Sequence, residues 1–476
     1  MSSKSFFVYC FILCYISLWY QVLIYNNPLV SWGKIHFDPN IIINRKRHFS
    51  KERMFTMRYY KNAKEAKEVR DAAATKAVAD IICQVRQDKD QALKDLAEKF
   101  DHTTLTQIRV SKEDIKKAYE MVDAHVVESF KKAADQIAFY AKEQLNCIKP
   151  LQVMSPVAGV ELGHRLIPVD GAGLYVPGGR FPLPSTALML SIPAKIAGVK
   201  RTVACSPANK QYGMIHPATL VAMDIGGVDE IYTVGGAQAI AAMAYGTESI
   251  AKVDLIAGPG NRYVTEAKRQ VMGTVGIDSL AGPSEVLIVA DETANPEYIA
   301  VDLLAQSEHD AFAQSTLIIT DESKIPGILK AMEELAAKLP TGEAAMQSFA
   351  DNGTIIIADD MEEMAALANE AAPEHLEVHT KDPVEYSKKL YQFGSLFIGE
   401  DAPVALGDYC SGTNHTLPTM KNAKFSNGVY VGTFLKTSFV QHITKEGLRN
   451  LADTCMTMAH TEGLAAHEMS VKIRLQ

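Results

Sequence analysis

The sequence predicts an α/β fold in which helices alternate with the strands of parallel sheets. Three features support this prediction: apolar runs of strand length, Gly-rich segments after several of these runs, and helical spacing of apolar residues beyond each Gly-rich segment. The units recur every 25 to 35 residues, roughly, as βαβ units do. With 476 residues, 47% of them apolar, the chain can form two or more domains with hydrophobic cores.

The first part of the chain is expected to be helical. Residues 61–100 and 112–144 are rich in Ala, Lys, Glu and Asp at helical periodicity, and Asp101-His102-Thr103 is the predicted break between the helices. Beyond this region the pattern predicts helices at 186–197 and 215–225, and strands at 166–170, 203–205, 230–234 and 255–257. Gly-rich segments follow three of the strands, at 171–180, 235–236 and 258–260.

These Gly-rich segments predict a ligand-binding edge. Turns at the carboxyl ends of parallel strands present backbone N–H groups and helix N-termini, which stabilise an anionic ligand such as a dinucleotide. The standard G-x-G-x-x-G fingerprint is absent, because Val176 stands where Gly171 and Gly173 would require a third glycine. The alternative is that each glycine only makes a tight turn, but three in successive units favour a shared ligand edge.

The segment 281–310 contains the first candidate site residues. A Gly-Pro-Ser turn is followed by a predicted buried strand at 285–291 and by a helix that begins near Tyr298. Gln306 and His309 are three residues apart on this helix and share one face, so an amide oxygen and an imidazole can face one object. The alternative is a solvated helix end.

The rest of the chain adds further strands and two polar segments. Strands are predicted at 315–320, 353–358 and 394–399, with a helix at 328–339. Glu374 and His375 are neighbours on a predicted loop after a helix, where they can provide general acid–base chemistry, or form only a surface pair. The polar loop 407–415 contains Asp408 and His415, and a docking helix at 445–460 precedes Glu462 and His467.

A metal site is one hypothesis for these polar residues. Two imidazoles, a carboxylate and an amide oxygen without a thiolate suit Zn²⁺ or Mn²⁺. Such a set is available from Gln306, His309, Asp408 and His467. The positions are far apart in the sequence, and no local motif such as H-E-x-x-H connects them.

Charge and cysteine content exclude several classes of protein. The net charge of −8 and the lack of a basic block argue against a nucleic-acid-binding protein. The seven cysteines form no C-x-x-C pair, which indicates reduced thiols in a cytoplasmic protein. They do not predict a disulfide framework.

Residues 1–56 form an N-terminal extension that differs in composition from the rest. Residues 6–25 contain no charge and are long enough to cross a bilayer, with a basic flank that would leave the main body in the cytoplasm. The other interpretation is that translation starts at Met54 or Met57. We favour the later start because the composition changes abruptly near Met57. A membrane contact is expected only if the extension is translated.

Eight motifs occur along the chain in a fixed order: GLYVPGG, VGGAQAIAA, GPGN-x-YV-x-EAKR, GIDSLAGPSE, LL-x-Q-x-EHD, APEHLE, GDYCSGTNH-x-LPT and EGLAAH. From Arg58 to Arg474 the chain resembles the histidinol dehydrogenase family in these motifs. The resemblance implies oxidation of L-histidinol to L-histidine through L-histidinal, the last steps of histidine biosynthesis, with reduction of two NAD. It also implies one Zn²⁺ per subunit and a homodimer with shared active sites.

The resemblance further implies two incomplete Rossmann-like domains. Residues 57–165 would be the helical part of the first domain, 166–283 the NAD-binding domain and 284–428 the rest of the first domain. Residues 429–476 would form a tail that reaches the partner subunit.

The resemblance also assigns roles to individual residues. Glu374 and His375 would be the acid–base pair, with His375 taking the alcohol proton and Glu374 activating water for the second oxidation. NAD would contact Tyr175, Gln238 and Asn261, and zinc would be held by Gln306, His309, Asp408 and His467. The substrate would contact the zinc ligands together with Ser284, His375, His415 and Glu462.

Two other functions stay open at this point. One is a paralogous NAD-dependent dehydrogenase of another small hydroxyl substrate, such as sulfopropanediol, which would share the cofactors but not turn over histidinol. The other is a non-catalytic scaffold, which the complete set of candidate catalytic residues disfavours.

Overall fold

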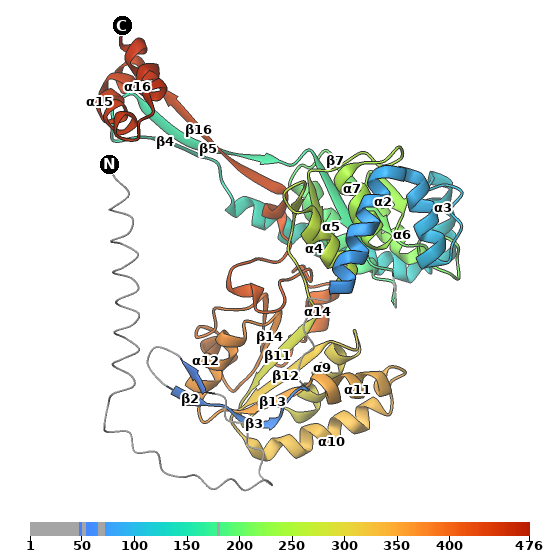
Figure 1. Ribbon diagram of the computed structural model, residues 1–476. Helices are drawn as coiled ribbons and strands as arrows, with labels where there is room; N and C mark the ends of the chain where they lie inside the picture. The colour runs from blue at the N-terminus through green and yellow to red at the C-terminus, as the bar shows by residue number, and fades with distance from the viewer. Residues whose placement is uncertain (1–46, 50–53, 65–71, 179–180) are drawn as a thin grey trace. The chain divides into compact units, whose positions relative to one another are not determined.

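The computed structural model describes residues 47–49, 54–64, 72–178 and 181–476 (Figure 1). The apolar segment at 6–25, in which the sequence suggested an anchor, lies outside these residues. Within the described part of the chain, no helix combines the length and apolar character needed to cross a bilayer. Two short strands, β1 (Arg47–Phe49) and β2 (Met54–Thr56), pair in antiparallel fashion.

The first large sheet has five parallel strands in the order β10-β9-β6-β7-β8. Alternate residues of its strands enter two separate apolar cores: Leu174 and Ala204 belong to one, and Tyr175 and Val203 to the other. The strands are β6 (Gly171–Tyr175), β7 (Arg201–Ser206), β8 (Glu230–Thr233), β9 (Leu255–Ala257) and β10 (Gly276–Ile277).

Helices cover both faces of this sheet (Figure 1). One core includes α3 (Lys112–Met121), α4 (Ala124–Cys147), α5 (Pro184–Ile196) and α6 (Pro217–Ile225). The other includes α2 (Ala72–Leu96), α7 (Gly236–Tyr245) and α8 (Arg262–Val271). The predicted break is confirmed, since a π-helical segment ends at Asp101 and His102 has a left-handed φ of 52°.

The predicted boundaries at the start of this sheet were wrong. Gly171 and Gly173 lie within β6 and not in a turn, and residues 166–168 belong to β5 of a different sheet. A Cβ on Gly173 would lie 2.6 Å from Met243 Sδ and 3.1 Å from Val253 Cγ2, so close packing explains a glycine in a buried strand. The turn that follows the first strand therefore begins at Val176.

The second large sheet has six strands in the order β15-β14-β11-β12-β13-β3, and β3 alone is antiparallel to its neighbour. Its strands are β3 (Arg58–Lys61), β11 (Glu285–Ala290), β12 (Gln314–Ile319), β13 (Thr354–Ile357), β14 (His375–His379) and β15 (Ser395–Ile398). One face packs against α9 (Pro296–Ser307), α10 (Ile325–Ala336) and α11 (Gly342–Asn352). The other face packs against α12 (Met361–Ala371) and α13 (Pro383–Ser387). The parallel five-stranded sheet and the largely parallel six-stranded sheet confirm the predicted α/β class.

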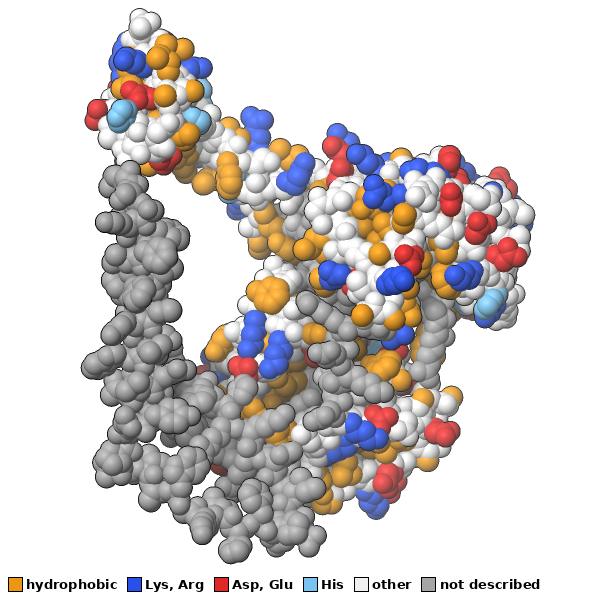
Figure 2. Space-filling model, viewed as in Figure 1, with side chains coloured by type: hydrophobic (Ala, Val, Ile, Leu, Met, Phe, Trp, Pro, Cys, Tyr) orange, Lys and Arg blue, Asp and Glu red, His pale blue; other side chains and the backbone are white. Residues whose placement is uncertain are grey.

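A third, antiparallel sheet was not predicted. Its order is β16-β5-β4, formed by β4 (Leu151–Met154), β5 (Val160–Pro168) and β16 (Leu435–Ile443). The tail continues into α15 (Lys445–Thr461) and α16 (Ala465–Lys472), and the turn before β5 contacts α15 through the Thr444 N–H, which donates to the Gly159 carbonyl at 2.9 Å. Apolar side chains along this sheet and the tail helices are exposed (Figure 2), including Met154, Phe439 and Met458.

Candidate functional site

Glu374 and His375 lie at the amino end of β14, the second strand from one edge of the six-stranded sheet. The prediction of a loop was wrong for His375, which is the first residue of the strand. β14 pairs with β11 on one side and β15 on the other, so both side chains are held by a central strand. Glu374 is 6% exposed and His375 is 4% exposed. This pair is therefore a buried acid and imidazole and not a surface pair.

The Glu374 carboxylate is held by the turn before β11. Its Oε2 accepts hydrogen bonds from Ser284 Oγ at 2.6 Å and from the Glu285 backbone N–H at 2.9 Å. Burial raises the pKa of Glu374, although His375 and these hydrogen bonds oppose the shift. A carboxyl group with a raised pKa is closer to the range in which a general base works near neutral pH. Ser284 therefore contacts the predicted catalytic acid–base residue directly.

Glu285 is a site residue that sequence reasoning missed, because it reads as the first residue of an apolar strand. Its Oε1 accepts a hydrogen bond from the Met420 backbone N–H at 2.8 Å. Burial and the neighbouring Glu374 carboxylate raise the pKa of Glu285 to about 7. The sequence feature that could have identified Glu285 is its position as an acidic residue between a Gly-Pro-Ser turn and an apolar strand.

The raised pKa of Glu285 predicts a pH dependence of stability. The folded state binds its proton more tightly than the unfolded state, so stability is expected to fall as pH rises from about 4.5 to 7. Glu285→Gln removes this loss and should raise the free energy of unfolding by about 3 kcal/mol at pH 8, with little difference at pH 4.5. Urea unfolding at both pH values tests this, with Glu385→Gln, an exposed position, as the control. Parallel pH profiles for wild type and Glu285→Gln would contradict it.

The tautomer of His375 follows from its hydrogen bond. Nδ1 lies 3.0 Å from the Glu285 carbonyl oxygen, which can only accept, so Nδ1 carries the proton. Nε2 of the neutral ring then has a free lone pair. It is buried without a hydrogen-bond partner among the described residues and lies 3.8 Å from Asp408 Oδ1. His375 thus presents an unoccupied proton acceptor towards Asp408.

Asp408 and His415 are connected through the polar segment after β15. Asp408 lies in the short helix α14 (Val404–Tyr409), so this part of the predicted loop was wrong. His415 Nδ1 donates to the Asp408 carbonyl at 2.9 Å. Its Nε2 lies 3.1 Å from Thr186 Oγ1 of α5, which then donates to it. Burial lowers the pKa of His415, which favours this neutral form.

Gln306 lies in the last turn of α9, as predicted, but the prediction that His309 is on the same helix was wrong, because α9 ends at Ser307. Gln306 is buried and its Nε2 atom has no hydrogen-bond partner among the described residues. His309 follows the helix and is exposed, and it lies close enough to His415 to affect its charge, as do Asp408 and His375. The structure thus brings His309, His375, Asp408 and His415 into one neighbourhood.

His467 and Glu462 are not part of this neighbourhood within one chain. His467 lies on α16 and Glu462 follows α15, and both side chains are exposed. The backbone N–H of His467 donates to the Leu464 carbonyl within the tail. Of the predicted metal ligands, His309 and Asp408 lie in the neighbourhood of His375, and Gln306 is three residues before His309 in the chain.

The predicted cofactor residues gather at the carboxyl edge of the first sheet. Tyr175 ends β6, and its Oη accepts a hydrogen bond from the Gly236 N–H at 3.0 Å. A Cβ on Gly236 would lie 2.7 Å from Gln238 Oε1, so Tyr175 and Gln238 flank the same turn. Both side chains are buried, and burial raises the pKa of Tyr175. Asp101 lies near Tyr175, and burial raises the pKa of its carboxyl group to about 6. The sequence pattern marked Asp101 only as part of a helix break and did not place it near Tyr175.

Asn261 belongs to the same edge but is exposed. Its Oδ1 accepts hydrogen bonds from the N–H groups of Tyr263 and Val264 and so caps α8. Gly258, three residues earlier, has a φ of +127°, and a Cβ there would lie 2.2 Å from the Tyr175 carbonyl oxygen. Only glycine fits this close approach of the two turns.

A buried ion pair holds the Gly258 turn. The Lys268 ammonium of α8 pairs with Asp278 and donates to the Gly258 carbonyl at 2.9 Å. The other Asp278 oxygen accepts from the Gly258 N–H at 2.8 Å. Both side chains are 3% exposed. The pair therefore satisfies both backbone groups of Gly258, the glycine at this edge of the sheet.

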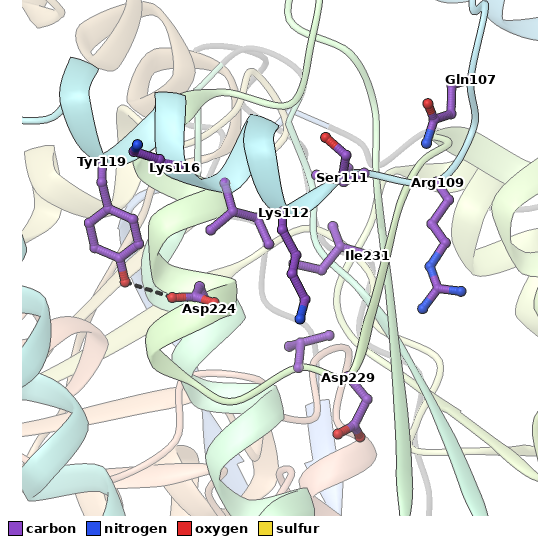
Figure 3. Close-up of a pocket in the computed structure, with 12 residues that line it drawn as sticks. Gln107, Arg109, Ser111, Lys112, Lys116, Tyr119, Asp224, Asp229 and Ile231 are labelled. Carbon is purple, nitrogen blue, oxygen red and sulfur yellow. Dashed lines mark hydrogen bonds between the residues drawn. The ribbon is translucent and has the colours of Figure 1, made fainter.

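A pocket of about 800 Å³ lies beside β8, next to α3 and α6 (Figure 3). Arg109, Lys112 and Lys116 line it together with Asp224 and Asp229, and Tyr119 Oη donates to Asp224 at 2.8 Å. The residues lining it include none of the predicted catalytic, metal or cofactor residues. Ser111 caps α3 with a complete capping box, so the helix N-terminus at this pocket is already satisfied.

Comparison with known proteins identifies the family. The family described as histidinol dehydrogenase matches residues 64–475. The chain is 47% identical over 399 residues to histidinol dehydrogenase of Methanocaldococcus jannaschii, covering 84% of this chain and 92% of the relative. It is 40% identical over 419 residues to that of Clostridium acetobutylicum, covering 88% and 96%.

A solved structure agrees with these relatives. The crystal structure of histidinol dehydrogenase from Elizabethkingia anophelis superposes with a TM-score of 0.82 at 38% identity, covering 87% of this chain and 94% of that chain. The family match at residues 64–475 includes the whole first sheet, β11 to β15 of the second sheet and the Glu374–His375 pair. The chain is therefore an enzyme that belongs to the histidinol dehydrogenase family.

Proposed function

We propose that the enzyme oxidises L-histidinol to L-histidine through L-histidinal, using two NAD and a zinc ion. The observation that carries the proposal is the buried, unpartnered Nε2 of His375, with Nδ1–H held by the Glu285 carbonyl. This arrangement presets a proton acceptor for an alcohol. Family membership supports histidinol as the alcohol.

The donor groups of this chain fit a zinc ion. Gln306 is buried, and its amide oxygen, together with imidazole and carboxylate donors and no thiolate, suits Zn²⁺ at a site that admits substrate. Gln306, His309 and Asp408 of one chain would hold the ion, together with His467 of the partner subunit. When bound, zinc would act as a Lewis acid that fixes the substrate and polarises its oxygen.

The residues of the chain would then divide the chemistry between them. His375 Nε2 takes the hydroxyl proton as hydride leaves the substrate carbon for NAD, which gives the aldehyde. Glu374, with its raised pKa, would take a proton from the water that adds to the aldehyde carbon, while the proton held by His375 returns to the aldehyde oxygen and gives the hydrate. Loss of a second hydride to a second NAD, together with two protons, would then give the carboxylate. Ser284 keeps the Glu374 carboxylate in position through its hydrogen bond.

NAD would bind at the carboxyl edge of the first sheet. The glycines that follow β8 and β9 carry no side chains, so a ligand at this edge could approach the backbone of these turns closely. Asn261 is exposed at this edge and would contact the cofactor, while Tyr175 and Gln238 support the turn around Gly236. Thr186 connects this domain to the catalytic residues, because α5 contacts His415.

The exposed His467 suggests a dimer in which each tail completes the partner's site. This predicts intersubunit complementation between two inactive variants, His309→Ala and His467→Ala. In a dimer of one chain of each kind, one site contains both substitutions and the other contains neither. An equimolar mixture that is refolded together should therefore regain about a quarter of the wild-type rate of NADH formation from L-histidinol.

The control is the double variant His309→Ala/His467→Ala mixed with wild type, where each mixed dimer has one substitution in each site. About a quarter of the wild-type rate then remains, all of it from wild-type homodimers. Failure of the two single variants to complement each other would contradict a shared site. Turnover of another alcohol but not of L-histidinol would move the proposal to a different substrate.

A further inference from the structure

A second group of titratable side chains lies next to the proposed catalytic residues. It consists of Asp302 on α9 with Glu377 and His379 on β14, and their candidate ligand atoms all lie within 4.8 Å of one another. Glu377 is 0% exposed and His379 is 1% exposed. None of the three belongs to the predicted zinc site.

The pleat of β14 explains why these residues meet. Leu376 and Val378 belong to the apolar core that packs against α12. The alternate residues His375, Glu377 and His379 therefore point to the opposite face, on which α9 lies. A row of three buried polar side chains on a central strand is costly unless each has a partner.

Hydrogen bonds to the described residues leave two buried polar atoms of this group without a partner. Glu377 Oε1 accepts from the Val404 N–H at 2.9 Å, but Glu377 Oε2 and His379 Nδ1 have no partner among the described residues. His379 Nε2 lies 3.6 Å from Glu377 Oε2, which is too long for a hydrogen bond. Two ligand atoms bound to one tetrahedral Zn²⁺ lie about 3.4 Å apart. The spacing thus fits two ligands of one ion better than a direct contact.

We propose that Asp302, Glu377 and His379 bind a second divalent cation, Zn²⁺ or Mn²⁺. Two carboxylates and an imidazole form a donor set suited to either ion, with water in the remaining positions. The two carboxylates place negative charge in a buried setting, and a divalent ion neutralises it. Asp302 is only partly buried and gives the ion a path from solvent.

The ion would join the elements that carry the catalytic residues. Asp302 is one turn before Gln306 on α9, and Glu377 is two residues after His375 on β14. Glu377 also binds the first N–H of α14, which carries Asp408. The second cation would therefore have a structural role. This inference rests on the proposed function in one respect: the expected total of two ions per chain includes the proposed catalytic zinc.

The number of bound ions tests the inference. The whole chain is stripped with EDTA, loaded with Zn²⁺ alone, gel-filtered and analysed for zinc per chain. Wild type should bind two ions, Glu377→Gln and His379→Gln one each, and His309→Ala also one. Glu363→Gln, which alters another buried carboxyl group on α12, should keep both ions and serves as the matched control.

The patterns separate the two sites. One ion in wild type that is lost in His309→Ala and kept in Glu377→Gln would overturn the second site and leave the catalytic zinc. One ion lost only in Glu377→Gln would support the second site and contradict the catalytic zinc. If the Glu377 and His379 variants do not fold, the zinc content of His309→Ala tests the inference alone. One zinc ion retained by His309→Ala would support the second site, and a metal-free His309→Ala chain would overturn it.

Discussion

Replacing His375 with asparagine is expected to lower kcat for NADH formation by about 10²- to 10⁴-fold, the usual contribution of a general base. The Asn amide can still donate to the Glu285 carbonyl in place of Nδ1–H, which lies 3.0 Å from it. The change therefore removes the free Nε2 and preserves the hydrogen bond that positions the side chain. KM for NAD should change little, because the cofactor edge lies in the other sheet.

Steady-state kinetics with His216→Asn as the control check this prediction. His216 caps α6 through Nδ1, and asparagine is a favourable capping residue, so this variant should keep wild-type activity. A kcat for His375→Asn within tenfold of wild type would mean that another group removes the hydroxyl proton.

Lys268→Met is expected to destabilise the fold by about 3 to 5 kcal/mol, because it leaves the Asp278 carboxylate buried without its partner. The Lys268–Asp278 pair is 3% exposed on both sides, and Lys268 also donates to the Gly258 carbonyl. Urea unfolding gives the change in stability, and KM for NAD should rise because the Gly258 turn loses its support.

Two comparisons separate this effect from a general loss of charge. Lys388→Met breaks the exposed pair with Glu385 and should cost less than about 1 kcal/mol. The double variant Lys268→Met/Asp278→Asn removes both buried charges and should recover much of the lost stability. Equal effects of Lys268→Met and Lys388→Met would contradict the structural role of the buried pair.

The parallel strands with continuous apolar runs could be predicted from the sequence, because both faces of β11, β12 and β13 are buried. The strand β14 could not be predicted in this way, because His375, Glu377 and His379 interrupt the apolar run on one of its faces. The residues of β6 were predicted to form a turn because glycine is a poor strand former. Glycine is needed at Gly173 because side chains from distant segments, Met243 and Val253, leave no room for a Cβ there. α14 has six residues, too few for helical periodicity.

The sequence predicted several residues of the site but not the hydrogen bonds that orient them. The three-residue spacing of Gln306 and His309 placed both at one helix end, and the polar segment after β15 contained Asp408 and His415 as expected. The hydrogen bonds that define the His375 tautomer involve a backbone carbonyl, which no sequence pattern specifies. The proposed role of His467 would require a second subunit, so it stays a prediction.

The most direct test of the proposed function is the stoichiometry of NADH formed from limiting L-histidinol by the zinc-loaded enzyme. We predict two NADH for each L-histidinol, with activity lost on chelation and restored by Zn²⁺. One NADH per L-histidinol with release of the aldehyde would contradict the second oxidation. No turnover of L-histidinol by folded, zinc-loaded enzyme would contradict the proposed substrate.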